Sequence, residues 1–255
     1  MVYRLSIIHR LTMHPIFSPF WSFTNSAMDY FLIALFVLLL FLIFTLQSQK
    51  RTVTGYSPRL AWIRGGIYFT SGFILSVLTG VLPALISNPI ATFEQVSNPY
   101  WWLFTFLCVG IIYFAYFYLW PRGTLTHGRE LHLLQVLFFG LFWGLGEGQV
   151  LLSAWAVTEK FISNTWVTAL VTFLIVGTFK GLWQSQYWDI HVAPEHNIPE
   201  WNLKKVLFGH IPNLICTLSY LAIFGNALIF LLLQTAGLMY MTYRMRFPAW
   251  TDDRP

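Results

Sequence analysis

Histidine and carboxylate residues gather in two short polar segments of a chain that is otherwise very apolar. Imidazole and carboxylate groups are ligands that zinc and non-haem iron accept, and several of each can bridge two irons that activate oxygen. We therefore expect a metal site for iron, one or two ions, or for zinc, with the five histidines as ligands and Glu130 and Glu195 as catalytic carboxylates. The whole set comprises His127, Glu130, His132, Asp189, His191, Glu195, His196 and His210.

The first polar segment, HGRELH, precedes a long apolar stretch and contains His127, Glu130 and His132. If a helix begins near His127, then His127 and Glu130 lie on one face, whereas His127 and His132 are about 140° apart around the axis. The two histidines could then bind one ion only if His127 lies in the loop before the helix. Alternatively, each histidine serves a different ion of a pair.

The second polar segment, residues 188–201, is interrupted by prolines and carries His191, Glu195 and His196. A non-helical loop of this kind can bring these three side chains to a common point. We expect His210 to join them from the first turns of the following helix, on the same side of the membrane.

The H-x4-H spacing occurs twice, as His127/His132 and His191/His196. Paired spacings of this kind, at the ends of membrane helices, resemble the histidine boxes of membrane desaturases and hydroxylases. That resemblance implies a di-iron centre acting on acyl chains, sterols or carotenoids. The chain has no H-x-x-H-H box, so the resemblance is one of ligand type and topology.

Glu147 is a separate signal, because it lies in the middle of an apolar stretch where an unpaired charge is costly. Gly140, Gly144 and Gly148 form a stripe of small residues that lets a second helix approach closely. On a helical wheel Glu147 falls about 20° from Gly140, and it lies roughly 22 Å along the axis from His132. We therefore expect Glu147 inside the bundle and away from the metal ligands.

The expected role of Glu147 is that of an acid that handles a proton or contacts substrate. The other interpretation is a protonated glutamate that is hydrogen-bonded across a tight helix pair. Gln149, Lys180 and Asn213 are its candidate partners.

The composition places these residues in an integral membrane protein: 56% of the 255 residues are hydrophobic and only 10% are charged. The net charge of +5 comes from basic residues that flank apolar stretches, so we expect no nucleic-acid partner. Cys108 and Cys216 both lie inside apolar stretches, which supports neither a disulfide framework nor a cysteine zinc site. They are expected to be small core residues.

The chain is therefore expected to be an all-α bundle of about seven transmembrane helices, each about 20 residues long. Residues 1–28 form an N-terminal interfacial segment, 29–246 the membrane domain and 247–255 a short tail. The glycine and asparagine at 225–226 should divide the last apolar stretch into two helices. A short helix is expected from Pro199 to Lys205. The expected spans are 29–46, 61–86, 101–120, 131–157, 165–184 and the two halves of 206–245.

Lysine and arginine are unequally divided between the two sides of this topology. The rich side should be cytoplasmic, which puts the N-terminus outside and the C-terminus and the histidine segments in the cytoplasm. Only Arg4, Arg10 and Lys160 fall on the other side. The rich side holds Lys50, Arg51, Arg59, Arg64, Arg122, Arg129, Lys204, Lys205, Arg244, Arg246 and Arg254.

Three classes of function fit this pattern. The first is a membrane enzyme that oxidises, desaturates or hydroxylates a lipid-soluble substrate, such as an acyl chain or isoprenoid, with electrons from an external donor. The second is a metal-free lipid isomerase, cyclase or transferase that uses Glu147 as a general acid. The third is a carrier, or an accessory subunit of a membrane complex, that uses Glu147 to move an ion or a proton.

Overall fold

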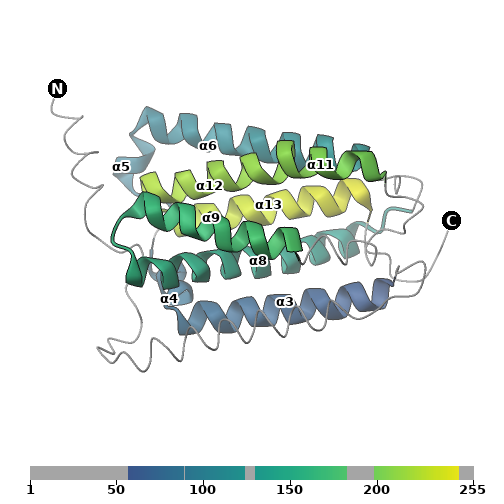
Figure 1. Ribbon diagram of the computed structural model, residues 1–255, viewed down its shortest axis with the longest axis horizontal. Helices are drawn as coiled ribbons and strands as arrows, with labels where there is room; N and C mark the ends of the chain where they lie inside the picture. The colour runs from purple at the N-terminus through teal and green to yellow at the C-terminus, as the bar shows by residue number, and fades with distance from the viewer. Residues whose placement is uncertain (1–56, 89, 124–129, 183–197, 247–255) are drawn as a thin grey trace.

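Long helices running back and forth make up the described part of this chain, which consists of residues 57–88, 90–123, 130–182 and 198–246 of a computed structural model (Figure 1). No strand occurs within these ranges. The expected first span, 29–46, lies outside them, as do the N-terminal segment 1–28 and the tail 247–255. The all-α prediction is therefore confirmed for the part of the chain that can be described.

Two of the long helices are composite. The helix from Pro99 to Arg122 is continuous through a π-helical segment, and so is the helix from Pro199 to Phe224. The elements in chain order are α3 (Pro58–Leu78), α4 (Val81–Ser87), α5 (Phe93–Val96), α6 (Pro99–Ile112), the π-helical η1 (Tyr113–Leu119), α7 (Trp120–Arg122), α8 (Leu133–Phe161), α9 (Thr165–Leu182), the 3₁₀ turn η4 (Pro199–Trp201), α11 (Asn202–Lys205), the π-helical η5 (Val206–His210), α12 (Ile211–Phe224) and α13 (Ala227–Met245).

Four of the described helices are long and apolar enough to cross a membrane: Pro58–Leu78, Pro99–Arg122, Leu133–Phe161 and Pro199–Phe224. The apolar part of α9, Thr165–Thr178, is shorter. The structure thus supports a membrane protein with several apolar helices of spanning length. The total of seven spans and the sides of the two termini remain predictions.

The expected span 61–86 is two helices rather than one. Ser57 caps the start of α3 through the bond that Leu60 N donates to its hydroxyl, and Pro58 occupies the first turn. The helix ends at Leu78 because Gly80 adopts a left-handed conformation, with φ of 79°, and α4 begins after it. The apolar run continues through this break, which is why the sequence pattern alone did not reveal it.

The division of the last apolar stretch at residues 225–226 is confirmed. Gly225 ends α12 with φ of 64°, and the Asn226 side chain caps α13 by accepting a hydrogen bond from Ile229 N at 2.9 Å. The start of α12 differs from the prediction. The expected short helix at Pro199–Lys205 runs on without interruption, so it forms the first turns of the long helix.

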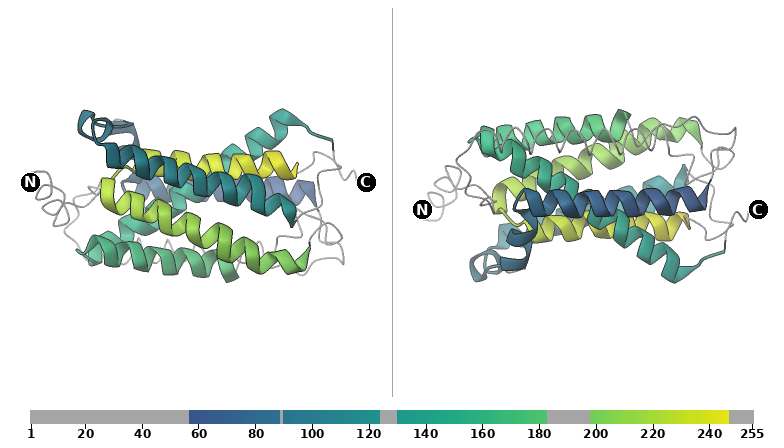
Figure 2. Two further views of the ribbon diagram at one scale, coloured as in Figure 1. Left: turned by 90° about the horizontal axis from the view of Figure 1, so that it is seen from above. Right: turned by 90° about the horizontal axis from the view of Figure 1, so that it is seen from below.

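The helix α8 lies at the centre of the bundle, between α13 on one side and α3 on the other (Figure 2). A Cβ atom on Gly144 would lie 2.6 Å from the Thr235 Cα in α13, and one on Gly140 would lie 2.8 Å from the Met239 Cα. The predicted glycine stripe therefore does admit a second helix, and that helix is α13. A second close approach joins α8 to α3, where a Cβ on Gly72 would lie 2.6 Å from the Gly146 carbonyl oxygen.

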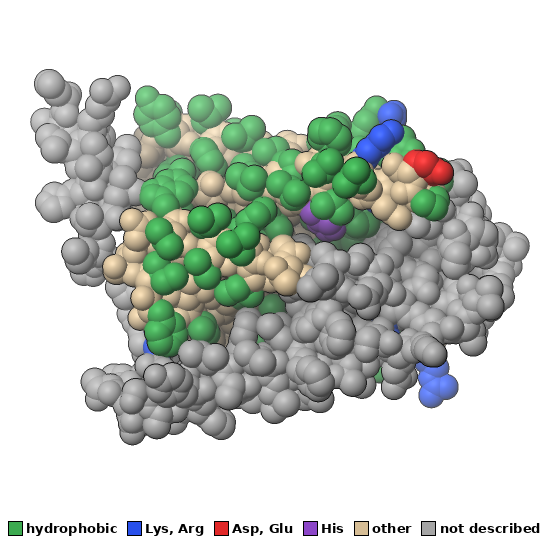
Figure 3. Space-filling model, viewed as in Figure 1, with side chains coloured by type: hydrophobic (Ala, Val, Ile, Leu, Met, Phe, Trp, Pro, Cys, Tyr) green, Lys and Arg blue, Asp and Glu red, His purple; other side chains and the backbone are tan. Residues whose placement is uncertain are grey.

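Apolar side chains cover much of the outer surface as well as the interior. Hydrophobic side chains are spread along the helices of the face in Figure 3, and charged side chains lie towards its ends. Large exposed residues such as Phe106, Leu134, Leu170 and Phe208 belong to several different helices. This distribution is expected of a bundle surrounded by lipid, where the outer face contacts hydrocarbon.

Candidate functional site

A buried tyrosine joins two helices at the centre of the most polar part of the interior. The Tyr116 hydroxyl lies 3.1 Å from His210 Nδ1, and it accepts a hydrogen bond from Asn213 Nδ2 at 3.0 Å. Tyr116 is 1% exposed and Asn213 is fully buried. Since buried polar groups are costly unless they are hydrogen-bonded, this bridge stabilises the contact between the two helices.

The hydrogen-bonded chain continues from Asn213 into α13. Asn213 Nδ2 also lies 3.4 Å from Gln234 Oε1, and Gln234 Nε2 donates to Thr217 Oγ1 at 2.8 Å. The Thr217 hydroxyl donates in turn to the Asn213 carbonyl at 2.7 Å. We call the five residues His210, Tyr116, Asn213, Gln234 and Thr217 the polar chain.

Two π-helical segments bring the polar chain together. Tyr116 lies in η1 and His210 is the last residue of η5, and these segments pack against each other. A π-helical turn holds an extra residue and rotates the side chains that follow it, and such turns are frequent at functional sites. Here they direct an aromatic hydroxyl and an imidazole towards each other from helices 94 residues apart in sequence.

Two glycines provide the space that the tyrosine and its neighbour Trp120 occupy. A Cβ on Gly237 of α13 would lie 2.9 Å from the Tyr116 ring, and one on Gly209 would lie 3.0 Å from Trp120 Nε1. The Trp120 and His210 rings pack edge to face, with centroids 4.7 Å apart. The imidazole is thus held between an indole and a phenol.

Glu147 lies close to the polar chain, in the middle of the central helix. It is the fifteenth of the 29 residues of α8 and is 2% exposed. Its carboxyl group is near enough to Tyr116 to interact with it electrostatically. The prediction that Glu147 points into the bundle is therefore confirmed, and one of its proposed partners, Asn213, belongs to the chain beside it.

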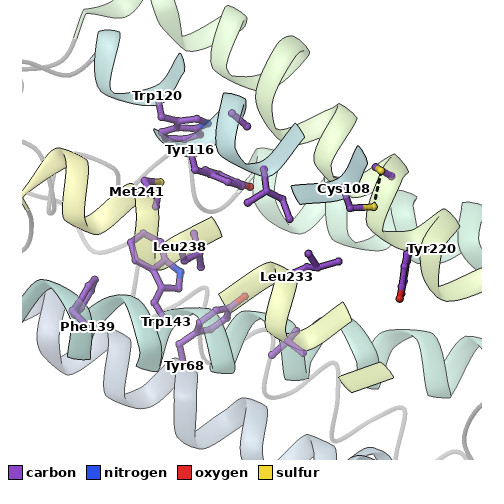
Figure 4. Close-up of a cluster of buried hydrophobic side chains, with 14 of the residues drawn as sticks. Tyr68, Cys108, Tyr116, Trp120, Phe139, Trp143, Tyr220, Leu233, Leu238 and Met241 are labelled. Carbon is purple, nitrogen blue, oxygen red and sulfur yellow. Dashed lines mark hydrogen bonds between the residues drawn. The ribbon is translucent and has the colours of Figure 1, made fainter. Parts of the chain in front are cut away.

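Aromatic and aliphatic side chains line this part of the interior, and Figure 4 shows five of them: Tyr116, Trp120, Leu238, Trp143 and Tyr68. All five are at most 7% exposed. In such a medium of low dielectric constant, each hydrogen bond and each charge has a larger effect than it would have in water.

His210 lies deeper than the sequence predicted. We expected it in the first turns of its helix, near the membrane face, but the helix begins at Pro199, eleven residues earlier. These eleven residues correspond to roughly 16 Å of helix. His210 contacts Tyr116 and Trp120 inside the bundle, and its role as a metal ligand remains a prediction.

Glu130 and His132 lie at the open end of the bundle, ahead of α8. The helix begins at Leu133, with His132 as the residue before its first turn. The His132 Nε2 and a Glu130 carboxylate oxygen are 4.0 Å apart, and both side chains are exposed. For a helix starting near His127, we derived fixed angles around the helix axis between the side chains of this segment. Those angles do not apply to Glu130 and His132, because the helix starts after them.

The remaining predicted ligands, His127, His191, Glu195 and His196, lie outside the described residues, and so does Asp189. Among the residues that the structure does describe, no three histidine, cysteine, aspartate or glutamate side chains are placed to hold one metal ion. The predicted metal site therefore remains a prediction.

The two segments that carry those ligands nevertheless begin or end close together. The Gly123 carbonyl accepts hydrogen bonds from Ile198 N at 3.1 Å and from Lys205 Nζ at 3.0 Å. Gly123 directly precedes segment 124–129, and Ile198 directly follows segment 183–197. Lys205 is 2% exposed. Its charge is compatible with burial because its ammonium group binds a backbone carbonyl.

Sequence reasoning missed Tyr116, Thr217 and Gln234 as members of a site. Each is a polar residue in a strongly apolar stretch, and in a membrane helix such residues usually face a protein neighbour. That signal was present in the sequence for Gln234. It was weak for Tyr116, because the stretch 113–120 contains several other aromatic residues.

Comparison with models of protein families, with curated proteins and with solved structures finds no match for this chain. Its function is therefore inferred from the site alone. The site can hold a proton on a buried carboxyl group, and a phenol and an imidazole that can each donate or accept lie nearby.

Proposed function

We propose that this chain is an integral membrane protein that exchanges a proton at Glu147, as a carrier or as a subunit of a larger membrane complex. The observation that carries the proposal is the hydrogen-bonded contact between His210 and Tyr116, at 3.1 Å, beside the buried Glu147 carboxyl. Ionisable groups within a membrane bundle commonly mark pathways for ions or protons.

The polar chain supports a definite order of proton positions. Asn213 Nδ2 donates to the Tyr116 oxygen, so the phenol proton is available to the neutral Nδ1 of His210. When His210 gains a proton, its Nδ1–H donates to the same oxygen instead. The phenol proton must then turn away from the imidazole, and we propose that it turns towards Glu147. Tyr116 thus relays the protonation state of His210 to Glu147.

The protonation state of Glu147 matters in this arrangement because a charge costs more than a neutral carboxyl group in an apolar interior. Loss of the proton would create a carboxylate on α8, whose glycines pack closely against α13 and α3. We expect the packing of these helices to depend on whether Glu147 is protonated. This dependence is the means by which proton exchange would drive a change in the bundle.

The distribution of basic residues supports one orientation of the bundle in the membrane. Arg59, Arg122, Lys204 and Arg244 lie at the end where α3, α8 and α11 begin, whereas Lys160 lies near the opposite end (Figure 1). We propose that the basic end faces the cytoplasm. Under this proposal Glu130 and His132 are also cytoplasmic.

The test is proton uptake by the full chain reconstituted in lipid vesicles with a pH-sensitive dye inside. A pH difference imposed across the membrane should cause a flux that Glu147→Gln abolishes, because an amide cannot release a proton. The matched control is Glu200→Gln, which removes an exposed carboxyl group at the start of η4 and should leave the flux unchanged. Equal flux in the wild type, in Glu147→Gln and in empty vesicles would overturn the proposal.

The relay is tested separately with Tyr116→Phe, which keeps the ring and removes the hydroxyl. The flux should fall strongly while Glu147 stays in place, and an infrared titration should still detect the protonated carboxyl group. The control is Tyr118→Phe, on the exposed side of the same segment. A flux that is identical in Tyr116→Phe and in the wild type would exclude Tyr116 from the path.

A second candidate is the metal-dependent oxidation, desaturation or hydroxylation of a lipid-soluble substrate, supplied with electrons by an external donor. Two observations favour it: the 4.0 Å contact between His132 and Glu130, and the bond from Ile198 N to the Gly123 carbonyl. That bond joins Gly123 to Ile198, the described residues that flank the two ligand-bearing segments in the sequence.

Elemental analysis of purified protein tests this second candidate. We expect stoichiometric iron or zinc that is lost from a variant with His132, His191 and His196 replaced by alanine. Absence of both metals from folded protein would exclude it, whatever the proton flux. Proton flux and metal content are independent measurements, so either proposed function can be excluded while the other stands.

A further inference from the structure

The two cysteines of the chain, 108 residues apart in sequence, meet between α6 and α12. The Cys108 and Cys216 sulfur atoms are 2.8 Å apart, and Figure 4 shows the contact as a dashed line from Cys108. Both side chains are thiols in this structure. The sequence predicted two separate small core residues, and nothing in their spacing indicated that they would be neighbours.

The geometry of the contact suits a covalent bond. A disulfide has an S–S distance of about 2.05 Å, so the two sulfurs need to approach by only about 0.8 Å. The residues lie on facing sides of helices that pack directly against each other. Cys108 is fully buried and Cys216 is 6% exposed, which shields both thiols from oxidants dissolved in water.

The position within an apolar core selects the kind of oxidant. Cys108 and Cys216 belong to the same hydrophobic cluster as Ile112 and Tyr220, and Ile215 beside them is exposed on the outer face of α12. In a membrane, that outer face contacts lipid. A two-electron acceptor that dissolves in the bilayer can therefore come within one helix of the pair.

We propose that Cys108 and Cys216 form a reversible disulfide that joins α6 to α12, with a lipid-soluble quinone as the oxidant. The two S–H bonds break and one S–S bond forms. The two electrons and two protons that the thiols release reduce the quinone to a quinol. A dithiol reductant reverses the reaction.

The bond would fix the two helices that hold the polar chain. Tyr116 follows Cys108 by two helical turns on the same continuous helix, and Asn213 precedes Cys216 by one turn on α12. A cross-link at this point limits sliding or separation of these helices. Oxidation should therefore keep α6 and α12 in contact at Cys108 and Cys216, independently of any proton movement along the polar chain.

The experiment uses the full chain in lipid nanodiscs that contain a short-chain ubiquinone analogue. After incubation the protein is unfolded, treated with an alkylating agent and examined by mass spectrometry. We expect loss of two hydrogen atoms, no alkylation of either cysteine, and a cross-linked peptide containing Cys108 and Cys216. Dithiothreitol should restore two alkylation sites.

A matched control moves one thiol to the outer face of the same helix. The double variant Ile215→Cys, Cys216→Ser keeps two cysteines in the chain but separates them, so it should show no intramolecular cross-link. The proposal is overturned if quinone-treated wild-type protein still takes up two alkyl groups, or if the only disulfide links separate chains. Both readouts come from the wild type, so they remain decisive even if the variant does not fold.

Discussion

Glu147 and Glu130 are carboxylates on or next to the same helix, yet their surroundings are opposite. Glu147 is 2% exposed at the middle of α8, whereas the Glu130 side chain is 84% exposed ahead of its first turn. The first lies between Gly146 and Gly148 on the helix and interacts electrostatically with Tyr116, and the second is exposed and lies near His132. At the site of Glu147, the cost of burying the carboxyl group depends on whether it is protonated. At the site of Glu130, the carboxyl group can bind an ion or water.

The difference shows what the central helix provides. The glycines of α8 bring two neighbouring helices so close that little besides side chains of the bundle reaches Glu147. Within the described residues, no comparable packing surrounds Glu130 at the end of the bundle where α8 begins. Changes in the interior should therefore affect folding and proton exchange together, while changes at the end should affect binding with little effect on folding.

The largest effect should come from breaking the helix contact beside Glu147. In Gly72→Leu the new side chain would meet the Gly146 carbonyl oxygen, and because that atom is backbone the helices must separate. We expect a loss of about 3 kcal/mol in the free energy of unfolding. Denaturant unfolding in lipid micelles measures it.

The control for this change is Gly66→Leu on the same helix, where no atom lies within 4 Å of the position of a new Cβ. Its free energy of unfolding should stay within about 1 kcal/mol of the wild-type value. If the two variants are equally stable, then close packing of α3 on α8 does not explain why substitutions in the interior should cost more stability than substitutions at the end of the bundle.

A smaller effect should follow from Lys205→Ala, which tests whether the open end is uniformly tolerant. The substitution removes the hydrogen bond from Lys205 Nζ to the Gly123 carbonyl and leaves a space beside Trp120. We expect the free energy of unfolding to fall by about 2 kcal/mol. The exposed neighbour provides the control, since Lys204→Ala should change it by less than about 0.5 kcal/mol. Similar losses in both variants would mean that burial of Lys205 contributes nothing.

The smallest effect is expected for Glu130→Gln, the counterpart of the change at Glu147. The Glu130 side chain is exposed, so neutralising it removes only a weak surface interaction with His132. The free energy of unfolding should change by less than about 0.5 kcal/mol. Thermal unfolding of Glu130→Gln beside the wild type measures the change. A loss as large as that expected for Gly72→Leu would remove the distinction between the two regions.

Sequence reasoning succeeded where the deciding interactions are local. The helix break at Gly225 and the cap at Asn226 depend on residues within one turn, and the inward direction of Glu147 follows from its angle to Gly140 on one helix. It failed at the start of the helix that contains His210. There the buried Lys205 was taken for a boundary, although a carbonyl from a distant helix satisfies its charge.

The sequence by itself determined that this is a helical, apolar chain with an acid in the middle of a glycine-lined helix, because composition and the 3.6-residue period of the helix are properties of neighbouring residues. Only the tertiary structure decided which distant residues are in contact: Tyr116 with His210, Cys108 with Cys216, and Lys205 with Gly123. These pairs join residues at least 82 positions apart. Their contacts depend on which helix faces of the bundle pack together, and that choice is made by the packing energy of the whole fold.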